Sequence, residues 1–121
     1  MKKILFIEDE PTLQKTAGEF LEQKGYEVQK ALDGETGLKL AREHKPDLIL
    51  LDLILPKKDG FEVLKELKGD KETADIAVII LTNLEGGVDV EKALELGATT
   101  YLVKANYKLE EVAKKIEELL K

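Results

Sequence analysis

The sequence has 121 residues, of which 43% are apolar and 36% are charged, and these values predict one globular domain, residues 1–121, with a substantial core. The net charge of −6 argues against direct binding to nucleic acid or to an anionic membrane. Cys and Ser are absent and His44 is the single histidine, which excludes disulfides, thiol chemistry, zinc clusters and serine triads. The apolar stretch near the start is too short for a signal peptide or a membrane span, so we expect a cytoplasmic protein.

Short apolar runs along the chain predict five β-strands, and segments with helical periodicity fall between and after them. The predicted strands are residues 4–7, 26–31, 47–53, 76–82 and 99–103. The apolar stripes of the helices are Leu13, Ala17, Phe20 and Leu21 for the first, Phe61, Leu64 and Leu67 for the third, Val90, Ala93 and Leu94 for the fourth, and Leu109, Val112, Ala113, Ile116, Leu119 and Leu120 for the fifth. The second helix is expected at about 34–44, although Gly37 inside it costs about 1 kcal/mol relative to Ala.

Several residues indicate where these helices begin and end. Pro11 suits the first turn of the first helix, and Asp59 with Glu62 predicts a capping box at the start of the third. The stretches QKGY and LGATT carry glycine where the first and fourth helices should end. These signals agree with the periodicity.

Strands that alternate with helices in this way form a parallel α/β sheet through right-handed crossovers, with helices on both faces. In such sheets the ligand site lies at the carboxyl ends of the strands. Polar residues follow four of the predicted strands there, namely Glu8 and Asp9, Asp52, Thr82 and Lys104. We therefore expect these five side chains to face one crevice.

Asp52 is the unusual member of this set, because it interrupts the apolar stretch LILLDLILPKKDG. An unpaired carboxylate in a buried strand would be strongly destabilising, so it needs a partner. Three carboxylates beside one ammonium favour a bound cation, and Mg²⁺ prefers oxygen ligands of this kind. A carboxylate beside Mg²⁺ can accept a phosphoryl group as an aspartyl phosphate, with Lys104 and Thr82 binding the phosphoryl oxygens.

These residues together resemble the receiver domains of bacterial two-component response regulators, in particular the stand-alone receivers that are similar to chemotaxis regulators. The resemblance extends from end to end, through FIEDEP, LLDLILPKKDG, IILTNLE and YLVKA. Thr82, Tyr101 and Lys104 follow Asp52 by 30, 49 and 52 residues. The resemblance implies a flavodoxin-like (βα)5 fold, a doubly wound five-stranded parallel sheet in the order 2-1-3-4-5.

The resemblance also implies a role for each site residue. Asp52 is the phosphoacceptor; Asp9, Asp52 and the carbonyl of Ile54 are metal ligands; and Glu8 acts on the metal through water. Thr82 and Lys104 bind the phosphoryl group, and Tyr101 moves inward when Thr82 is drawn to it.

The function that this resemblance implies is a phosphorylation-activated switch rather than an enzyme, although the phosphoacceptor assists its own phosphorylation and dephosphorylation. The implied partners are a sensor histidine kinase, a phosphotransfer protein or a small phosphodonor, and a downstream protein. The signal passes through the face of the fourth helix, fifth strand and fifth helix, through which a monomer could dimerise when phosphorylated. Direct nucleic-acid binding and membrane insertion are not expected.

The sequence departs from the family pattern at three positions. Lys58 stands where Met is usual, Ala105 stands where most members have a proline after a cis bond, and Gly37 replaces a more usual Ala. A non-proline cis bond costs about 2.5–4 kcal/mol, so we expect a trans peptide between Lys104 and Ala105. Ile54 and Leu84 are expected to flank the path of water to the phosphoryl group; neither can hydrogen-bond water, which predicts slow self-dephosphorylation.

Other interpretations stay open. The same fold carries small α/β enzymes and flavin carriers, and an engineered or scaffold receiver could keep these residues without a signalling role. Against the flavin interpretation, EDEPTLQ after the first strand would repel a phosphate in the absence of a metal. His44 is expected only to complement a helix end, and Gly86 and Gly87 to permit a mobile loop.

Overall fold

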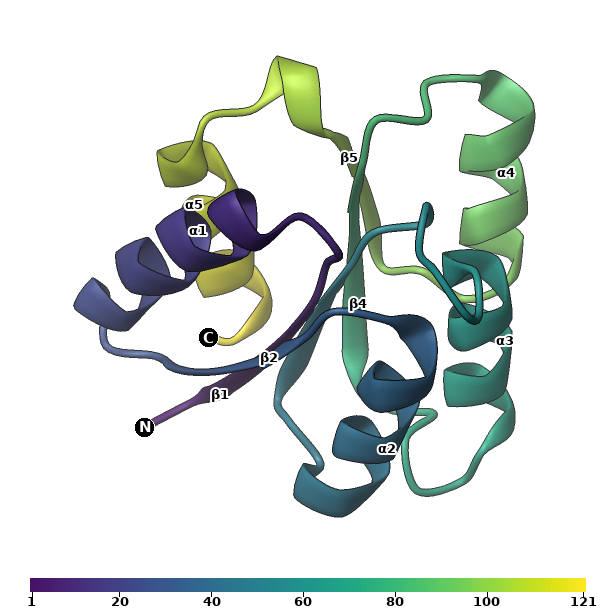
Figure 1. The fold of residues 1–121 in the computed structure, drawn as a ribbon, viewed down its shortest axis with the longest axis horizontal. Helices are drawn as coiled ribbons and strands as arrows, with labels where there is room; N and C mark the ends of the chain where they lie inside the picture. The colour runs from purple at the N-terminus through teal and green to yellow at the C-terminus, as the bar shows by residue number, and fades with distance from the viewer.

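The computed structural model describes residues 1–121 as a five-stranded sheet between two layers of helices (Figure 1). The strands are β1 (Lys3–Ile7), β2 (Glu27–Ala31), β3 (Leu48–Leu51), β4 (Ala77–Thr82) and β5 (Thr100–Val103). The helices are α1 (Pro11–Gln23), α2 (Gly34–His44), α3 (Gly60–Gly69), α4 (Gly87–Glu95) and α5 (Leu109–Leu119), with a 3₁₀ turn, η1 (Lys104–Asn106), before the last. None of these helices combines the length and the apolar character that crossing a lipid bilayer requires.

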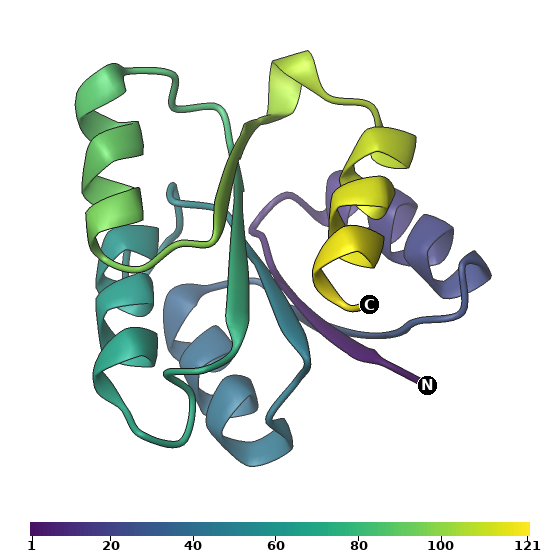
Figure 2. The ribbon, with the colours of Figure 1, turned by 180° about the vertical axis from the view of Figure 1, so that it is seen from behind.

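All neighbouring strands are parallel, in the order β2-β1-β3-β4-β5, so the predicted fold class is confirmed. In Figures 1 and 2, α1 and α5 lie side by side on one face of the sheet, and α2, α3 and α4 cover the other. Ile7 at the end of β1 is in register with Ala31 of β2 and Leu51 of β3, so these three strands end together. This common end is where the candidate site forms.

Alternating residues of the central strands build two separate cores. Leu5 and Ile7 point toward the side of α2, α3 and α4, whereas Ile4 and Phe6 point toward α1 and α5. All four residues of β3 are fully buried, as expected for a central parallel strand covered on both faces. The strand is shorter than the predicted 47–53. It ends at Leu51, and Leu53 is buried although it lies outside the sheet.

The helix ends follow most of the predicted signals. Pro11 occupies the first turn of α1, and Gly25 and Gly97 take positive φ values of 98° and 109° after α1 and α4. At the start of α3 the Asp59 carboxylate accepts hydrogen bonds from the N–H groups of Phe61 and Glu62 at 2.8 and 3.1 Å. The predicted capping box is only half formed, because no bond returns from the Glu62 side chain, and Asp59 alone caps the helix.

Gly37 has a packing reason for lacking a side chain. A Cβ added at this position would lie 2.6 Å from Cδ1 and 2.9 Å from Cγ1 of Ile7, which fills the space where α2 crosses β1. The helix therefore loses propensity at Gly37 while the core gains a close contact between α2 and the sheet.

The peptide bond between Lys104 and Ala105 is trans, as predicted, and the chain passes into η1 immediately after Lys104.

Candidate functional site

The carboxyl ends of the strands form an open hollow of about 390 Å³. Its lining comprises Glu8, Asp9, Glu10, Pro11, Asp52, Ile54, Asn83 and Lys104. The structure thus brings together four of the five polar side chains that the sequence placed at the strand ends. Thr82, the fifth, lies at the end of β4 and is fully buried.

Asp52 follows β3 directly and is only 3% exposed. Its Oδ2 pairs with the Lys104 ammonium at 3.0 Å, and its Oδ1 accepts a hydrogen bond from the Ile54 N–H at 3.2 Å. Its own N–H donates to the Ile7 carbonyl at 3.0 Å, which ties the residue to the end of β1. A cation and a backbone donor therefore offset the burial of this carboxylate, and one edge of the residue still opens on the hollow.

Glu8 follows β1 and is completely buried. Its Oε1 lies 2.8 Å from the Lys104 ammonium, and its Oε2 accepts a hydrogen bond from the Glu10 N–H at 3.1 Å. Burial raises the pKa of Glu8 to about 7, because the loss of hydration and the nearby Asp52 charge outweigh the contact with Lys104. This direct pairing of Glu8 with Lys104 was not predicted from the sequence.

Lys104 lies between the two buried acids and is 15% exposed at its side chain. Its burial alone would lower the pKa of the ammonium, but the hydrogen bonds to Glu8 and Asp52 raise the pKa above its usual value. The cation is therefore firmly charged, and it neutralises one of the two buried carboxylates.

The acidic side chains of the hollow could hold a metal ion. One carboxylate oxygen from each of Glu8, Asp9 and Asp52 lies within 4.8 Å of the other two. Asp9 is exposed, and its carboxylate makes no hydrogen bond or ion pair with the rest of the protein. Three carboxylates against one ammonium leave excess negative charge, and a donor set made only of oxygen suits a hard divalent cation such as Mg²⁺.

Thr82 and Tyr101 occupy neighbouring strands beside this site. The Thr82 hydroxyl is buried without a hydrogen-bond partner, which is unusual for a buried polar atom. The Tyr101 hydroxyl donates to the Leu84 carbonyl at 2.8 Å, on the loop after β4. A group that entered the hollow and accepted a bond from Thr82 would satisfy that hydroxyl.

The two apolar residues expected beside the path of water, Ile54 and Leu84, differ in exposure. Ile54 lines the hollow and is 53% exposed. Leu84 is not among the residues that line it; its side chain is half-buried against the core of α2, α3 and α4, and its place beside the path of water stays a prediction. Asn83 lines the hollow instead, and its only sequence signal was a polar side chain directly after the end of β4.

The loop that follows Asp52 is tightly folded. Lys57 has a positive φ of 67°, and the Lys58 N–H donates across it to the Pro56 carbonyl at 2.7 Å. Lys58, the position where the family usually has Met, pairs with Glu66 of α3. This departure therefore lies on the surface and leaves the site residues intact.

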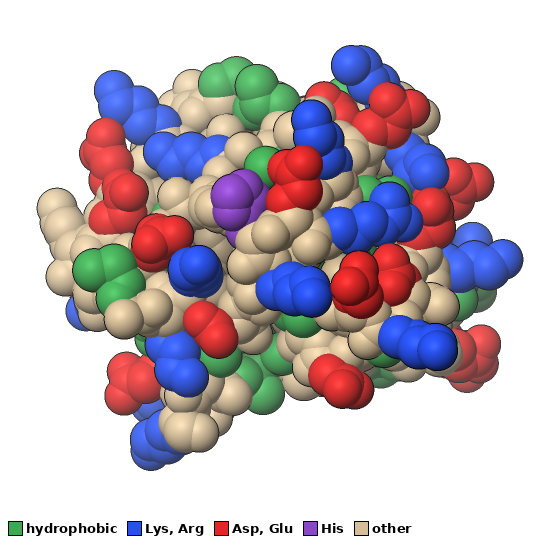
Figure 3. Space-filling view, turned by 90° about the horizontal axis from the view of Figure 1, so that it is seen from below, with side chains coloured by type: hydrophobic (Ala, Val, Ile, Leu, Met, Phe, Trp, Pro, Cys, Tyr) green, Lys and Arg blue, Asp and Glu red, His purple; other side chains and the backbone are tan.

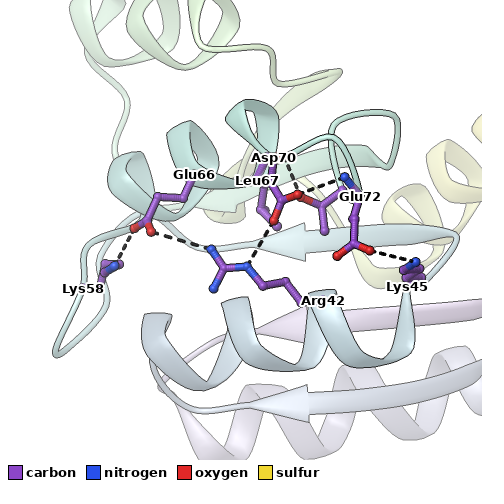
Figure 4. Close-up of polar contacts among 8 residues, drawn as sticks. Arg42, Lys45, Lys58, Glu66, Leu67, Asp70 and Glu72 are labelled. Carbon is purple, nitrogen blue, oxygen red and sulfur yellow. Dashed lines mark hydrogen bonds and ion pairs between the residues drawn. The ribbon is translucent and has the colours of Figure 1, made fainter.

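A larger hollow, of about 790 Å³, lies between α2 and α3, away from the strand ends. Charged side chains and Gly69 line it, and Figure 4 shows Arg42 of α2 reaching Asp70 at 3.3 Å and Glu66 at 3.8 Å. These exposed pairs join the two helices, and the hollow is lined by no hydrophobic side chain and no unsatisfied buried group. On the underside of the molecule, acidic and basic side chains are likewise interspersed (Figure 3).

Comparison with known proteins identifies the family to which this site geometry belongs. The family model described as the response regulator receiver domain matches residues 4–117. The chain is 43% identical over 121 residues to the DNA-binding dual master transcriptional regulator RpaA of Synechocystis sp., and spans 50% of that protein's length. It is 38% identical over 104 residues to the protein PilH of Pseudomonas aeruginosa, and this match covers 86% of each.

The solved structures agree. The chemotaxis protein CheY4 of Vibrio cholerae superposes with a TM-score of 0.91 at 28% identity, over 99% of each chain.

Proposed function

The chain belongs to the response regulator receiver domain family, and from this premise we propose that it is a phosphorylation-activated signalling switch with Asp52 as its phosphoacceptor. Receiver domains of two-component response regulators are signalling domains. The observation that carries the proposal is the position of Asp52, a buried carboxylate paired with Lys104 and opening on an acidic hollow at the ends of the strands.

In the proposed reaction an oxygen of Asp52 forms a bond to phosphorus, and the bond between phosphorus and the donor's leaving group breaks. The leaving group departs with the electron pair. Lys104 and Thr82 bind oxygens of the transferred group, and the unpaired Thr82 hydroxyl supports this role. The donor is a histidine kinase, a phosphotransfer protein or a small phosphodonor. The protein assists its own phosphorylation and dephosphorylation and is not an enzyme with a separate substrate.

The proposed metal is Mg²⁺, held directly by Asp9, Asp52 and the carbonyl of Ile54, and by Glu8 through water. When bound, it neutralises negative charge on the phosphoryl oxygens and the carboxylates. The close approach of the three carboxylates supports this ligand set. Asp9 has no partner in the protein and is free to turn toward the ion, whereas Asp52 and Glu8 are already fixed by Lys104.

The proposed output passes through α4, β5 and α5. When Thr82 is drawn toward the phosphoryl group, Tyr101 exchanges its bond to the Leu84 carbonyl for an inward position. The Leu84 carbonyl belongs to the loop that leads to α4, so the loss of this hydrogen bond frees that loop. The output partner is a downstream protein or a second copy of the chain. The name of RpaA includes DNA binding, but RpaA is twice as long as this chain. DNA binding is therefore not proposed for this chain.

The test is incubation with acetyl phosphate and Mg²⁺, followed by intact mass. We expect a single phosphoryl adduct that is absent in Asp52→Asn. The matched control is Asp75→Asn, which changes an exposed aspartate outside the hollow and should keep the adduct. An adduct that persists in Asp52→Asn, or no adduct at saturating donor, would contradict the proposal.

A further inference from the structure

Gln14 is a polar side chain on the buried stripe of α1, beside Ala17 and Leu21, and is only 6% exposed. Its amide nitrogen reaches the carbonyl of Ala31 at 2.9 Å and that of Glu8 at 3.2 Å, with the carbonyl of Phe6 at 3.4 Å. All three neighbours are acceptors, so the NH₂ end of the amide must face them. Two hydrogens are available, and they serve the two shorter contacts best.

These contacts lie where β1 and β2 end. The last bond between the two strands runs from the Glu8 N–H to the Ala31 carbonyl, at 2.9 Å. Gln14 shares that carbonyl and adds a bond to the carbonyl of Glu8 itself. A side chain in α1 points back toward the start of its helix, so the amide joins α1, β1 and β2 at one point.

We infer that Gln14 is a positioning residue for the metal site, because its amide fixes the peptide between Glu8 and Asp9. This inference rests on the proposed function. Rotation of that peptide would redirect the Asp9 side chain, which is exposed and has no partner of its own. Asp52 and Glu8 are held by Lys104, so the orientation of Asp9 depends on its backbone, and Gln14 holds that backbone.

The effect can be measured as the affinity of the folded protein for Mg²⁺. Gln14→Met and Gln14→Leu replace the amide with an apolar side chain of similar size and so remove the donor. Loss of a group that orients a metal ligand weakens metal binding by about 10–100-fold, so we expect a dissociation constant at least tenfold higher by titration calorimetry. In the metal-free variants the backbone amide signals of Asp9 and Glu10 should also broaden in NMR spectra.

Two controls separate positioning from stability. Gln23→Met makes the same change at the exposed end of the same helix. Ile116→Val, at a buried core residue of α5, lowers stability without touching the hollow. Both should bind Mg²⁺ as the wild type does. If the Gln14 variants lose stability but keep the wild-type dissociation constant, Gln14 is structural only and the inference is wrong. If the wild type itself binds no Mg²⁺, the proposed function fails instead.

Discussion

The stability of the metal-free protein should depend on pH through Glu8. Its pKa is 4.5 in an ordinary environment and about 7 in the folded protein, where the side chain is fully buried. Below pH 4.5 the carboxyl is protonated in both states, and the stabilising effect of its protonation is complete. As the pH rises through 7, the folded protein must ionise a buried carboxyl, and this stability is lost.

The size of the effect follows from the shift. Each pKa unit corresponds to about 1.4 kcal/mol, so a rise from 4.5 to about 7 amounts to about 3 kcal/mol in total. Part of this is already lost at pH 5, because Glu8 in the unfolded chain is then largely ionised. Between about pH 5 and about pH 8 we therefore expect the free energy of unfolding to fall by roughly 2–3 kcal/mol on account of this one group.

The assay is urea denaturation in the presence of EDTA across that pH range, for the wild type and Glu8→Gln. The glutamine keeps the size of the side chain and cannot ionise, so the wild type should lose stability relative to it as the pH rises. Glu118→Gln, an exposed change on α5, controls for the loss of one negative charge and should follow the wild type. If the wild type and Glu8→Gln keep a constant difference in stability from pH 5 to pH 8, the burial of Glu8 does not raise its pKa and the reasoning is wrong.

Three further predictions concern the metal, the second helix and the switch. Mg²⁺ should raise the melting temperature of the wild type by binding linkage, and Asp9→Ala should abolish the rise while leaving the metal-free protein as stable or more so; an unchanged response would indicate another ion site. Gly37→Ala should cost about 1–3 kcal/mol by crowding Ile7, whereas Gly69→Ala, where a Cβ meets nothing within 4 Å, should gain up to about 1 kcal/mol. If urea denaturation showed an equal gain in stability for the two variants, that contrast would be refuted. Amide exchange over residues 83–108 should change with a phosphoryl mimic, and identical exchange would argue against the switch.

Much of the site could be predicted from the sequence because the geometry of a parallel sheet is simple. The strands of such a sheet end at one edge, so Glu8, Asp9, Asp52 and Lys104 had to lie close together once the strands were placed. The same argument predicted a partner for Asp52, and the structure supplies Lys104 at 3.0 Å.

The remaining details depended on side-chain directions that no sequence period specifies. The alternation of a strand stops where the strand stops, so the sequence could not tell that Asn83 rather than Leu84 would line the hollow. Likewise, Gly37 has a role only because α2 crosses β1 at Ile7. Whether Glu62 completes a capping box is decided by its rotamer, which local sequence leaves free.

The lifetime of the proposed aspartyl phosphate should depend on the residues at the mouth of the hollow. Water must attack phosphorus opposite the oxygen of Asp52, so a side chain that hydrogen-bonds this water speeds hydrolysis. Ile54 lines the mouth, is 53% exposed and offers only an apolar surface. Leu84 is half-buried and packs against the core, so Ile54 is the more accessible of the two apolar residues expected beside the path of water.

Ile54→Asn should therefore shorten the lifetime, and an oriented water that lowers the barrier by about 1.4 kcal/mol would make the decay tenfold faster. The measurement is the loss of the phosphoryl adduct by intact mass after the donor is removed, with Mg²⁺ saturating. Leu119→Asn, a similar exchange at a partly exposed residue of α5, should decay as the wild type does. Leu84→Gln should accelerate the decay less, because residue 84 is half-buried and packs against the core. If Ile54→Asn decays no faster than Leu119→Asn, the apolar mouth does not set the lifetime. If instead Leu84→Gln gives the larger acceleration, the loop after β4 must turn Leu84 outward once Asp52 is phosphorylated.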